Sequence, residues 1–149
     1  MLKLTKYIYM TNEQALILNN VCSFLESEYF KSDSKFEIPK SLFYAVSRNI
    51  GRTKKAVKEK EELDDTVMKD FKKDSGFDDE KAKDEKYVEE ANVKFAEYKQ
   101  KDEIKEQYET FLKDEFKSVN DISKVKIEVF EEAILPNAYR EILEELIVE

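Results

Sequence analysis

The segment between Pro39 and Pro136 contains no proline, and the only two glycines of the chain, Gly51 and Gly76, both lie within it. Proline removes a backbone N–H donor and fixes φ, and glycine weakens a helix by about 1 kcal/mol. The same segment is rich in lysine and glutamate and carries apolar residues three and four positions apart. This pattern predicts long helices, and we expect an elongated, mainly helical protein.

Two helices are predicted in the first half of the chain. Thr11 and Gln14 have the spacing of a capping box, which opens a helix over residues 12–30. The apolar face of this helix consists of Leu18, Val21, Leu25 and Tyr29. Proline is tolerated in the first turn of a helix, so the second helix starts near Pro39 and continues to about Asp74. Its apolar stripe consists of Leu42, Phe43, Val46, Ile50, Val57, Val67 and Phe71.

A reversal of the chain is predicted at Gly76, which can take a positive φ after the second helix. A third helix then runs over about residues 79–117, because Asp78 or Asp79 can cap it. Residues 99–103 carry no apolar side chain, so the apolar stripe of this helix changes register there. We expect a distorted helix at this point, and an outright break is the alternative.

Two short strands are predicted near the ends of the chain. Leu2, Leu4 and Ile8 alternate with Lys3, Thr5 and Tyr7 near the N-terminus, and apolar and charged residues alternate over residues 124–129. An alternation of period two is typical of a half-buried strand. We expect the two strands to pair and so to shield each other's edges. A last helix beyond Pro136 covers this small sheet together with the first helix.

The predicted fold is therefore mainly α, of the α+β class. We expect residues 1–149 to form a single domain. Its head consists of residues 1–38 and 119–149 and contains a strand and a helix from each end of the chain. Its arm consists of residues 39–118 and is a long antiparallel pair of helices.

The charge of the chain argues against direct binding of nucleic acid. The formal net charge is −8 and the sequence pI is about 4.9, whereas nucleic-acid affinity depends on clustered lysine and arginine. The basic residues between Arg48 and Lys60 are followed by acidic ones, as on an ordinary solvated helix. Aromatic residues at helical spacing, including Tyr87, Phe95, Tyr98, Tyr108 and Phe111, fit core packing better than base stacking.

Histidine is absent from the chain, which removes the usual general base near neutral pH and the commonest nitrogen ligand of zinc. We therefore expect no enzyme activity and no catalytic residue. The single cysteine, Cys22, excludes an internal disulfide and fits a small buried side chain in a reducing compartment. No apolar stretch is long enough to span a bilayer, so we expect a cytoplasmic protein with no membrane contact.

Clustered carboxylates raise the hypothesis of a metal site. The clusters are Glu62, Asp64 and Asp65, and Asp78, Asp79 and Glu80. The residues before Gly76 lack the alternating acidic positions of a calcium-binding loop, so helix capping and surface charge explain these carboxylates better. A restriction-type nuclease places two carboxylates and a lysine around a strand, but the lysine expected two residues after Glu128 is Phe130 here. Two isolated glycines make no phosphate loop, and we expect no metal and no cofactor.

Three stretches of the sequence occur in an order that resembles a known family. They are residues 11–16 with Asn19 downstream, residues 36–50, and residues 124–130. Together they resemble an uncharacterised family of small phage and prophage proteins from Gram-positive bacteria. The resemblance implies a phage context. It implies no activity and no site residue, because none is assigned to that family.

Two functions remain open on the sequence. The first is a non-enzymatic accessory protein of a phage or prophage, which binds a structural or assembly component through its helical arm or its head. The second is an acidic inhibitor that binds a nuclease or another effector of a host defence system. The sequence does not locate the interaction surface. Polar interruptions between Lys58 and Glu62 leave room for a homodimer through the arm.

Overall fold

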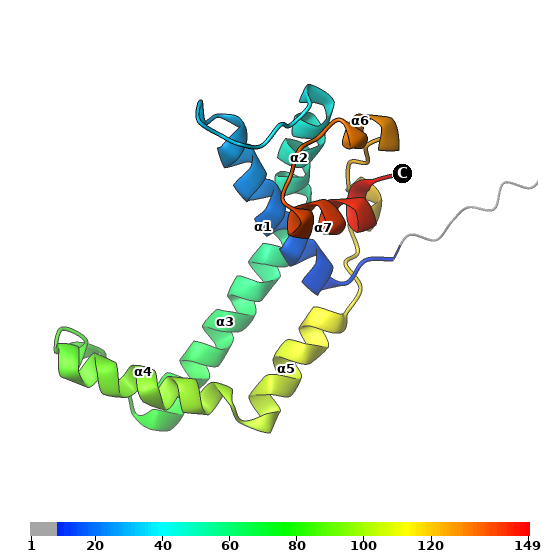
Figure 1. The fold of residues 1–149 in the computed structure, drawn as a ribbon. Coiled ribbons are helices and arrows are strands. Elements are labelled where there is room, and N and C mark those ends of the chain that lie inside the picture. Colours follow the sequence, from blue (N-terminus) through cyan, green and yellow to red (C-terminus); the bar gives the residue numbers. More distant parts are fainter. Residues whose placement is uncertain (1–8) are drawn as a thin grey trace, which may run out of the picture. The chain divides into compact units, whose positions relative to one another are not determined.

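The computed structural model describes residues 9–149, which form seven α-helices and two 3₁₀ helices (Figure 1). The α-helices are α1 (Asn12–Tyr29), α2 (Lys40–Arg52), α3 (Lys54–Ser75), α4 (Glu85–Lys99), α5 (Asp102–Lys113), α6 (Ile127–Glu131) and α7 (Asn137–Ile147). The 3₁₀ helices are η1 (Asp79–Lys81) and η2 (Val119–Asp121). The chain divides into two compact units. The first unit contains the described residues up to Val57 together with Asp114–Glu149, and the second unit is Lys58–Lys113.

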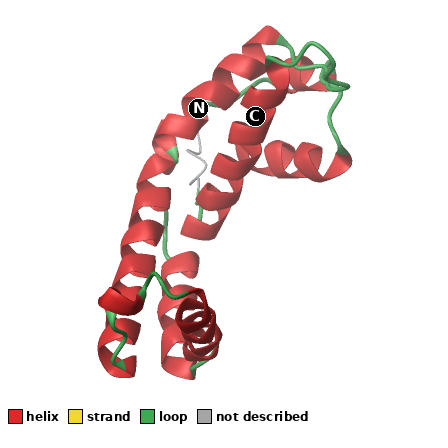
Figure 2. Cartoon of the chain, turned by 90° about the vertical axis from the view of Figure 1, so that its left-hand side faces the viewer, coloured by secondary structure: helices red, strands yellow, loops and turns green. Residues whose placement is uncertain are grey.

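The fold is all-α, so the prediction of an α+β class is wrong. Figure 2 shows helices and loops only in the described part of the chain. Residues 124–129 were expected to form a strand, but Lys126 precedes the short helix α6. The helix is shown by its backbone hydrogen bonds, since the N–H groups of Val129 and Phe130 both donate to the Lys126 carbonyl, at 3.1 and 3.2 Å. The strand predicted at Leu2, Leu4 and Ile8 lies outside the described residues.

Three isolated backbone bridges take the place of a sheet within residues 9–149. They join Thr11 to Glu115, Glu37 to Ile134, and Val125 to Val148. The bridge between Glu37 and Ile134 has both hydrogen bonds, of 3.0 and 2.8 Å. All three bridges lie within the first unit, where they join non-helical segments that are far apart in the sequence.

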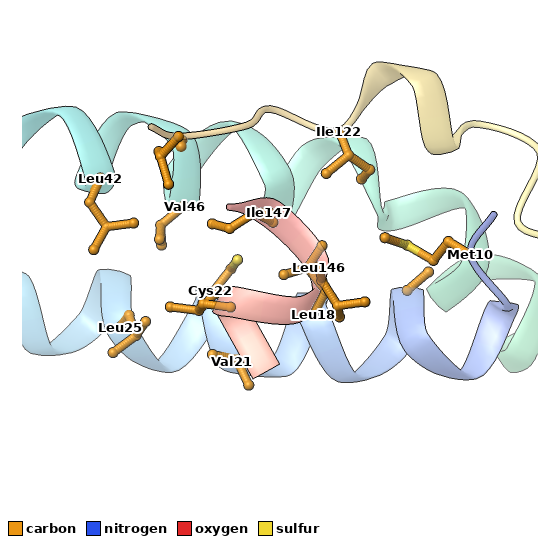
Figure 3. Close-up of a cluster of buried hydrophobic side chains, with 14 of the residues drawn as sticks. Met10, Leu18, Val21, Cys22, Leu25, Leu42, Val46, Ile122, Leu146 and Ile147 are labelled. Carbon is orange, nitrogen blue, oxygen red and sulfur yellow. The ribbon is translucent and has the colours of Figure 1, made fainter. Parts of the chain in front are cut away.

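The core of the first unit lies between α1, α2 and α7 (Figure 3). The predicted capping box at the start of α1 is confirmed, because the Gln14 N–H donates to Thr11 Oγ1 at 3.1 Å and the Thr11 N–H donates to Gln14 Oε1 at 3.0 Å. The buried face of α1 packs against α2, and the end of α7 covers the pair. The side chains in this core include Leu18, Val21, Cys22, Leu25, Leu42, Val46, Leu146 and Ile147.

A break at Thr53 replaces the continuous helix predicted from Pro39 to Asp74. The Thr53 hydroxyl donates to the Asn49 carbonyl at 2.6 Å and accepts from Asn19 Nδ2 at 3.0 Å. Hydroxyls that bond back to the preceding turn compete with the helical backbone pattern and bend helices. Asn49 is itself buried, and its side chain exchanges two hydrogen bonds with the backbone of Ser123. This polar cluster fixes the end of α2 inside the first unit.

The second unit turns at Gly76, which has a φ of +67° as the sequence predicts. The single helix predicted over residues 79–117 is wrong, since the chain forms η1, α4 and α5 there. Asp78 caps η1, and Asp84 begins α4 by accepting hydrogen bonds from the Lys86 and Tyr87 N–H groups. The expected register fault is an outright break after Lys99, and α5 then runs back beside the second half of α3 (Figure 1).

The core of the second unit is small. Its buried apolar side chains are Val67, Phe71 and Ile104. Phe71 packs against two rings of α4, with centroids 5.0 Å from Phe95 and 5.4 Å from Tyr98. No residue of α4 is itself buried.

A polar contact joins α3 to α5 in this unit. Tyr108 Oη donates to Asp64 Oδ1 at 2.7 Å, and Lys60 Nζ lies 2.9 Å from Asp64 Oδ2. Burial, the hydrogen bond to Asp64 and the charge of Asp64 raise the pKa of Tyr108 to about 12. Partial burial opposes ionisation of Asp64, but the hydrogen bonds from Lys60 and Tyr108 outweigh it and hold the pKa of this carboxyl below its usual value.

Candidate protein interface

Four aromatic side chains gather where α1 ends and α2 begins. Tyr29, Phe30, Phe43 and Tyr44 form this aromatic cluster. The rings of Tyr29 and Phe43 are stacked, and Phe30 meets both of them edge-on with centroids 5.4 Å away. Tyr44 lies against Phe43 at 6.0 Å. The cluster is therefore one continuous apolar surface built from two helices.

This surface is open to solvent. Phe30 is 73% exposed, Tyr44 is 47% exposed and Tyr29 is 38% exposed. A single exposed apolar residue needs no explanation, but a group of contiguous aromatic rings is the composition found at the centres of protein interfaces. Tyrosine and phenylalanine supply a large contact area at a low cost in side-chain entropy. The aromatic cluster is thus the strongest candidate interface in the described part of the chain.

The loop between α1 and α2 holds the cluster in place. The Glu28 carboxylate accepts hydrogen bonds from Lys31 Nζ at 2.8 Å and from Ser34 Oγ at 3.0 Å. The hydrogen bond from Lys31 is the main cause that lowers the pKa of Glu28 below its usual value. Desolvation opposes this effect, and the hydrogen bond from Ser34 adds to it. Farther along the loop, Glu37 is bridged to Ile134, and Pro39 sets the extended backbone from which α2 starts. The two helix ends that carry the rings are thus joined by a loop with fixed contacts, which lowers the conformational entropy lost on binding.

Positive charge adjoins the aromatic cluster on α2. The chain carries six lysines and arginines and no acidic residue between Glu37 and Glu59. Lys40, Arg48 and Arg52 are exposed and lie four or eight positions from Tyr44, so they share one side of α2, which we call the basic stripe. Lys40 Nζ lies 5.8 Å from the centroid of the Tyr44 ring. Arginine and tyrosine beside one another are frequent hot spots of binding.

Carboxylates also border the cluster, which distinguishes it from a phosphate-binding surface. Glu26 accepts a hydrogen bond from Ser47 Oγ at 2.8 Å, and Glu28 lies one position before Tyr29. These negative charges would repel a phosphate backbone close to the rings. The arrangement suits a protein surface that pairs apolar side chains with acidic ones.

The carboxylates considered for a metal site have other contacts. Asp64 accepts from Lys60 and Tyr108, Asp78 caps η1, and Asp79 lies 3.2 Å from Lys72 Nζ. Glu62, Asp65 and Glu80 are exposed. Within residues 9–149, no three carboxylate or cysteine side chains are grouped so that they could hold a metal ion.

Cys22 is buried, as the sequence predicts. Burial, with a contribution from the charge of Glu26, raises the pKa of its thiol to about 12. A thiol with so high a pKa and no solvent contact is a poor nucleophile. It serves as a small apolar side chain of the core.

The aromatic cluster was not identified from the sequence. The helical periodicity of the sequence places Tyr29 and Phe43 on apolar helix faces and gives no role to Phe30 or Tyr44. A usable signal was present, because two adjacent aromatic pairs flank a polar loop and the second pair begins a basic helix. Helical periodicity alone does not show which aromatic residues remain uncovered.

Comparisons with known proteins found no matching family model, curated protein or solved structure. Among residues 9–149, no helix combines the length and the apolarity needed to cross a membrane.

Proposed function

We propose that this chain is a non-enzymatic binding protein whose aromatic cluster and basic stripe contact a partner protein. The observation that carries the proposal is a cluster of four contiguous rings, three of them exposed and Phe30 by 73%, beside a helix side bearing Lys40, Arg48 and Arg52. The partner surface is expected to present apolar side chains surrounded by acidic ones. The absence of histidine and the burial of the only cysteine support a role without catalysis.

The resemblance to small phage and prophage proteins supports a phage context for this role. In that context the partner is a structural or assembly component of the virion, met in the cytoplasm of the host cell. No direct contact with nucleic acid or membrane is part of the proposal.

The alternative, inhibition of a host defence effector, is favoured by a different observation. The second unit, Lys58–Lys113, carries 19 acidic residues against 13 lysines, so it holds most of the net negative charge. An acidic protein can occupy the basic channel of a nuclease by charge complementarity. If expression of this chain alone restores phage growth on a defended host, and the contact involves the second unit, the alternative replaces the first proposal.

The test is affinity capture from phage-producing cells with the wild-type protein and two variants. The first variant, Phe30→Ser with Tyr44→Ser, removes the two most exposed rings of the cluster. The second, Val93→Ser, removes a side chain that is 61% exposed on α4 and serves as the matched control. A protein bound by the wild type and by the control, and lost from the double variant, is the expected result.

Charge reversal on the basic stripe gives a second readout for the same captured protein. Arg48→Glu should weaken its binding at least tenfold, because each interfacial charge contact contributes about 1–3 kcal/mol. Recovery of a virion component supports the assembly role, and recovery of a host nuclease supports the alternative. If every captured protein binds the double variant as well as the wild type, or if only nucleic acid is retained, the proposal is wrong.

A further inference from the structure

Helix α4 is poorly covered in the described structure. It has fifteen residues, none of them buried, and its apolar side chains Val88, Ala91, Phe95 and Tyr98 are half-buried against α3 and the turn before it. An isolated helix of this length is marginal in water, because packing supplies most helix stability in proteins. The helix therefore has an apolar side that gains from further burial.

A groove runs along one flank of α4. It has a volume of about 160 Å³ and is lined mainly by apolar side chains, from α3, the turn after it and α4. The lining includes Met68, Phe77, Val88, Asn92 and Phe95. Met68 is 36% exposed at its edge. This groove offers apolar contact area to a second helix.

The residues on this flank of α4 follow a repeat of three and four. Glu85, Val88, Asn92, Phe95 and Lys99 occupy it, which is the spacing of a helix-pairing face. Asn92 is at its centre, and Glu85 and Lys99 stand seven positions on either side of it. If a second α4 runs antiparallel to the first with the two Asn92 residues opposite each other, Glu85 of one helix therefore lies opposite Lys99 of the other.

We propose that α4 pairs with α4 of a second copy of this chain in an antiparallel, two-fold symmetric contact. Glu85 of each copy then meets Lys99 of the other, and Val88 meets the small, exposed Ala96. A two-fold interface uses the same surface on both copies, so that surface must be complementary to itself. The sequence around Asn92 is self-complementary in charge, because Glu85 and Lys99 lie at equal distances on either side of it. The antiparallel arrangement also brings opposite ends of the two helix dipoles together.

Asn92 lies at the centre of this contact. Its amide carries both donors and an acceptor, so the same side chain from two copies can hydrogen-bond across the two-fold axis. A single asparagine in an otherwise apolar helix contact fixes the register of the pair. Lys99 is held at the other end, where its Nζ lies 5.3 Å from the Phe95 ring centroid and 6.0 Å from that of Tyr108. This pairing is independent of the partner surface proposed above, which lies in the first unit.

The test is sedimentation equilibrium over a range of protein concentrations. The wild-type chain is expected to associate reversibly into a dimer. Glu85→Lys should weaken the dimer about tenfold, because two attractive contacts become repulsive at once. The double variant Glu85→Lys with Lys99→Glu should restore the wild-type dissociation constant, since each charge again meets its opposite.

Two matched controls localise the contact. Glu90→Lys makes the same change of charge on the opposite side of α4 and should leave the dissociation constant unchanged. In a Cys22→Ala background, Asn92→Cys should form a disulfide-linked dimer under mild oxidation, whereas Glu90→Cys should not. A wild-type chain that stays monomeric, a dimer weakened equally by Glu90→Lys, or a double variant that is not restored would each overturn the proposal.

Discussion

The ring of Tyr29 at the end of α1 stacks on the ring of Phe43 near the start of α2, with centroids 3.9 Å apart and planes inclined by 15°. This contact joins the two helices at the end where the loop leaves them. The more exposed ring of Phe30 packs edge-on against both of these stacked rings. Substitution of the half-buried, stacked ring of Phe43 should therefore change the free energy of unfolding more than substitution of the exposed ring of Phe30.

Phe43→Ala should lower the free energy of unfolding by about 1–3 kcal/mol, because it removes a half-buried ring and its stacking partner. Phe30→Ser should change it by less than about 0.5 kcal/mol, since most of that ring is already in water. Urea denaturation followed by circular dichroism measures both values. Equal losses from the two substitutions would show that Phe30 is part of the core and not of a free surface.

Asn49→Ala should lower the free energy of unfolding by about 2–3 kcal/mol. The substitution leaves the backbone N–H and carbonyl of Ser123 without the side-chain amide that now bonds them at 2.7 and 3.0 Å. Asn20→Ala, at an exposed position of α1, is the matched control and should cost less than about 0.5 kcal/mol. If water replaces the lost bonds without loss of stability, the two variants will unfold together.

The two glycines should respond to alanine in opposite directions. Gly51 lies inside α2 with open space at the position of an added Cβ, so Gly51→Ala should stabilise the protein by about 0.5–1 kcal/mol. Gly76 has a φ of +67°, where an L side chain is strained, so Gly76→Ala should destabilise the second unit by about 1 kcal/mol. Hydrogen exchange of the amides in α3 and α4 would report the second effect locally.

The contact between Tyr108 and Asp64 should appear in the titration of both groups. Since the folded pKa of Asp64 lies below its usual value, its contribution to stability is present above the unfolded pKa and is lost as the pH falls through the folded pKa. Tyr108 behaves oppositely, because its pKa is raised to about 12, and its contribution is lost as the pH rises through that value.

Tyr108→Phe removes the hydrogen bond and should raise the pKa of Asp64, which carboxyl-carbon NMR measures directly. Glu109→Gln, at the exposed neighbouring position, is the control and should leave the pKa of Asp64 nearly unchanged. An Asp64 pKa that does not move in Tyr108→Phe would mean that the Lys60 contact alone determines it.

Cys22 should be unreactive towards thiol reagents in the native protein at mildly alkaline pH, because its side chain is buried and its pKa is about 12. In denaturant it should react at the rate of a free thiol. A variant with Cys22→Ala and Ser23→Cys places the thiol at an exposed position of the same helix and should react at once. Rapid reaction of the native wild-type protein would contradict the burial of α1.

Helix content and the main turn could be predicted from the sequence, because they depend on local signals. The capping box at Thr11 and Gln14, the start of α2 after Pro39 and the positive φ of Gly76 each follow from the conformational preferences of a few neighbouring residues. These signals are the same in a peptide and in the folded protein.

The errors concern places where distant contacts decide the structure. The alternation over residues 124–129 suits a strand, but no neighbouring strand is present in the described residues, and burial of Phe130 favours the helix α6. The break at Thr53 depends on its contacts with Asn19 and Asn49, which periodicity does not show. The start of α4 was misplaced because Asp78, Asp79 and Asp84 are all suitable caps.

The candidate interface could not be predicted for a similar reason. Helical spacing does not determine whether an aromatic side chain is covered or exposed. Its exposure depends on which neighbouring segments pack against it in the folded structure. Phe30 and Tyr44 remain 73% and 47% exposed, and no spacing along the chain distinguishes them from the covered aromatic residues.

The first unit is built from two segments of the chain that are separated by the second unit. This arrangement affects the order in which the first unit forms during translation. The α1–α2 pair leaves the ribosome before the second unit, whereas α7, which supplies Leu143, Leu146 and Ile147 to the same core, is made after it. At typical synthesis rates the pair waits on the order of 5–20 s for its cover. During that interval the second unit is completed while the apolar side of α1 and α2 is uncovered. We therefore expect the nascent α1–α2 pair, rather than the highly charged second unit, to be the more aggregation-prone part of the described chain until α7 is made.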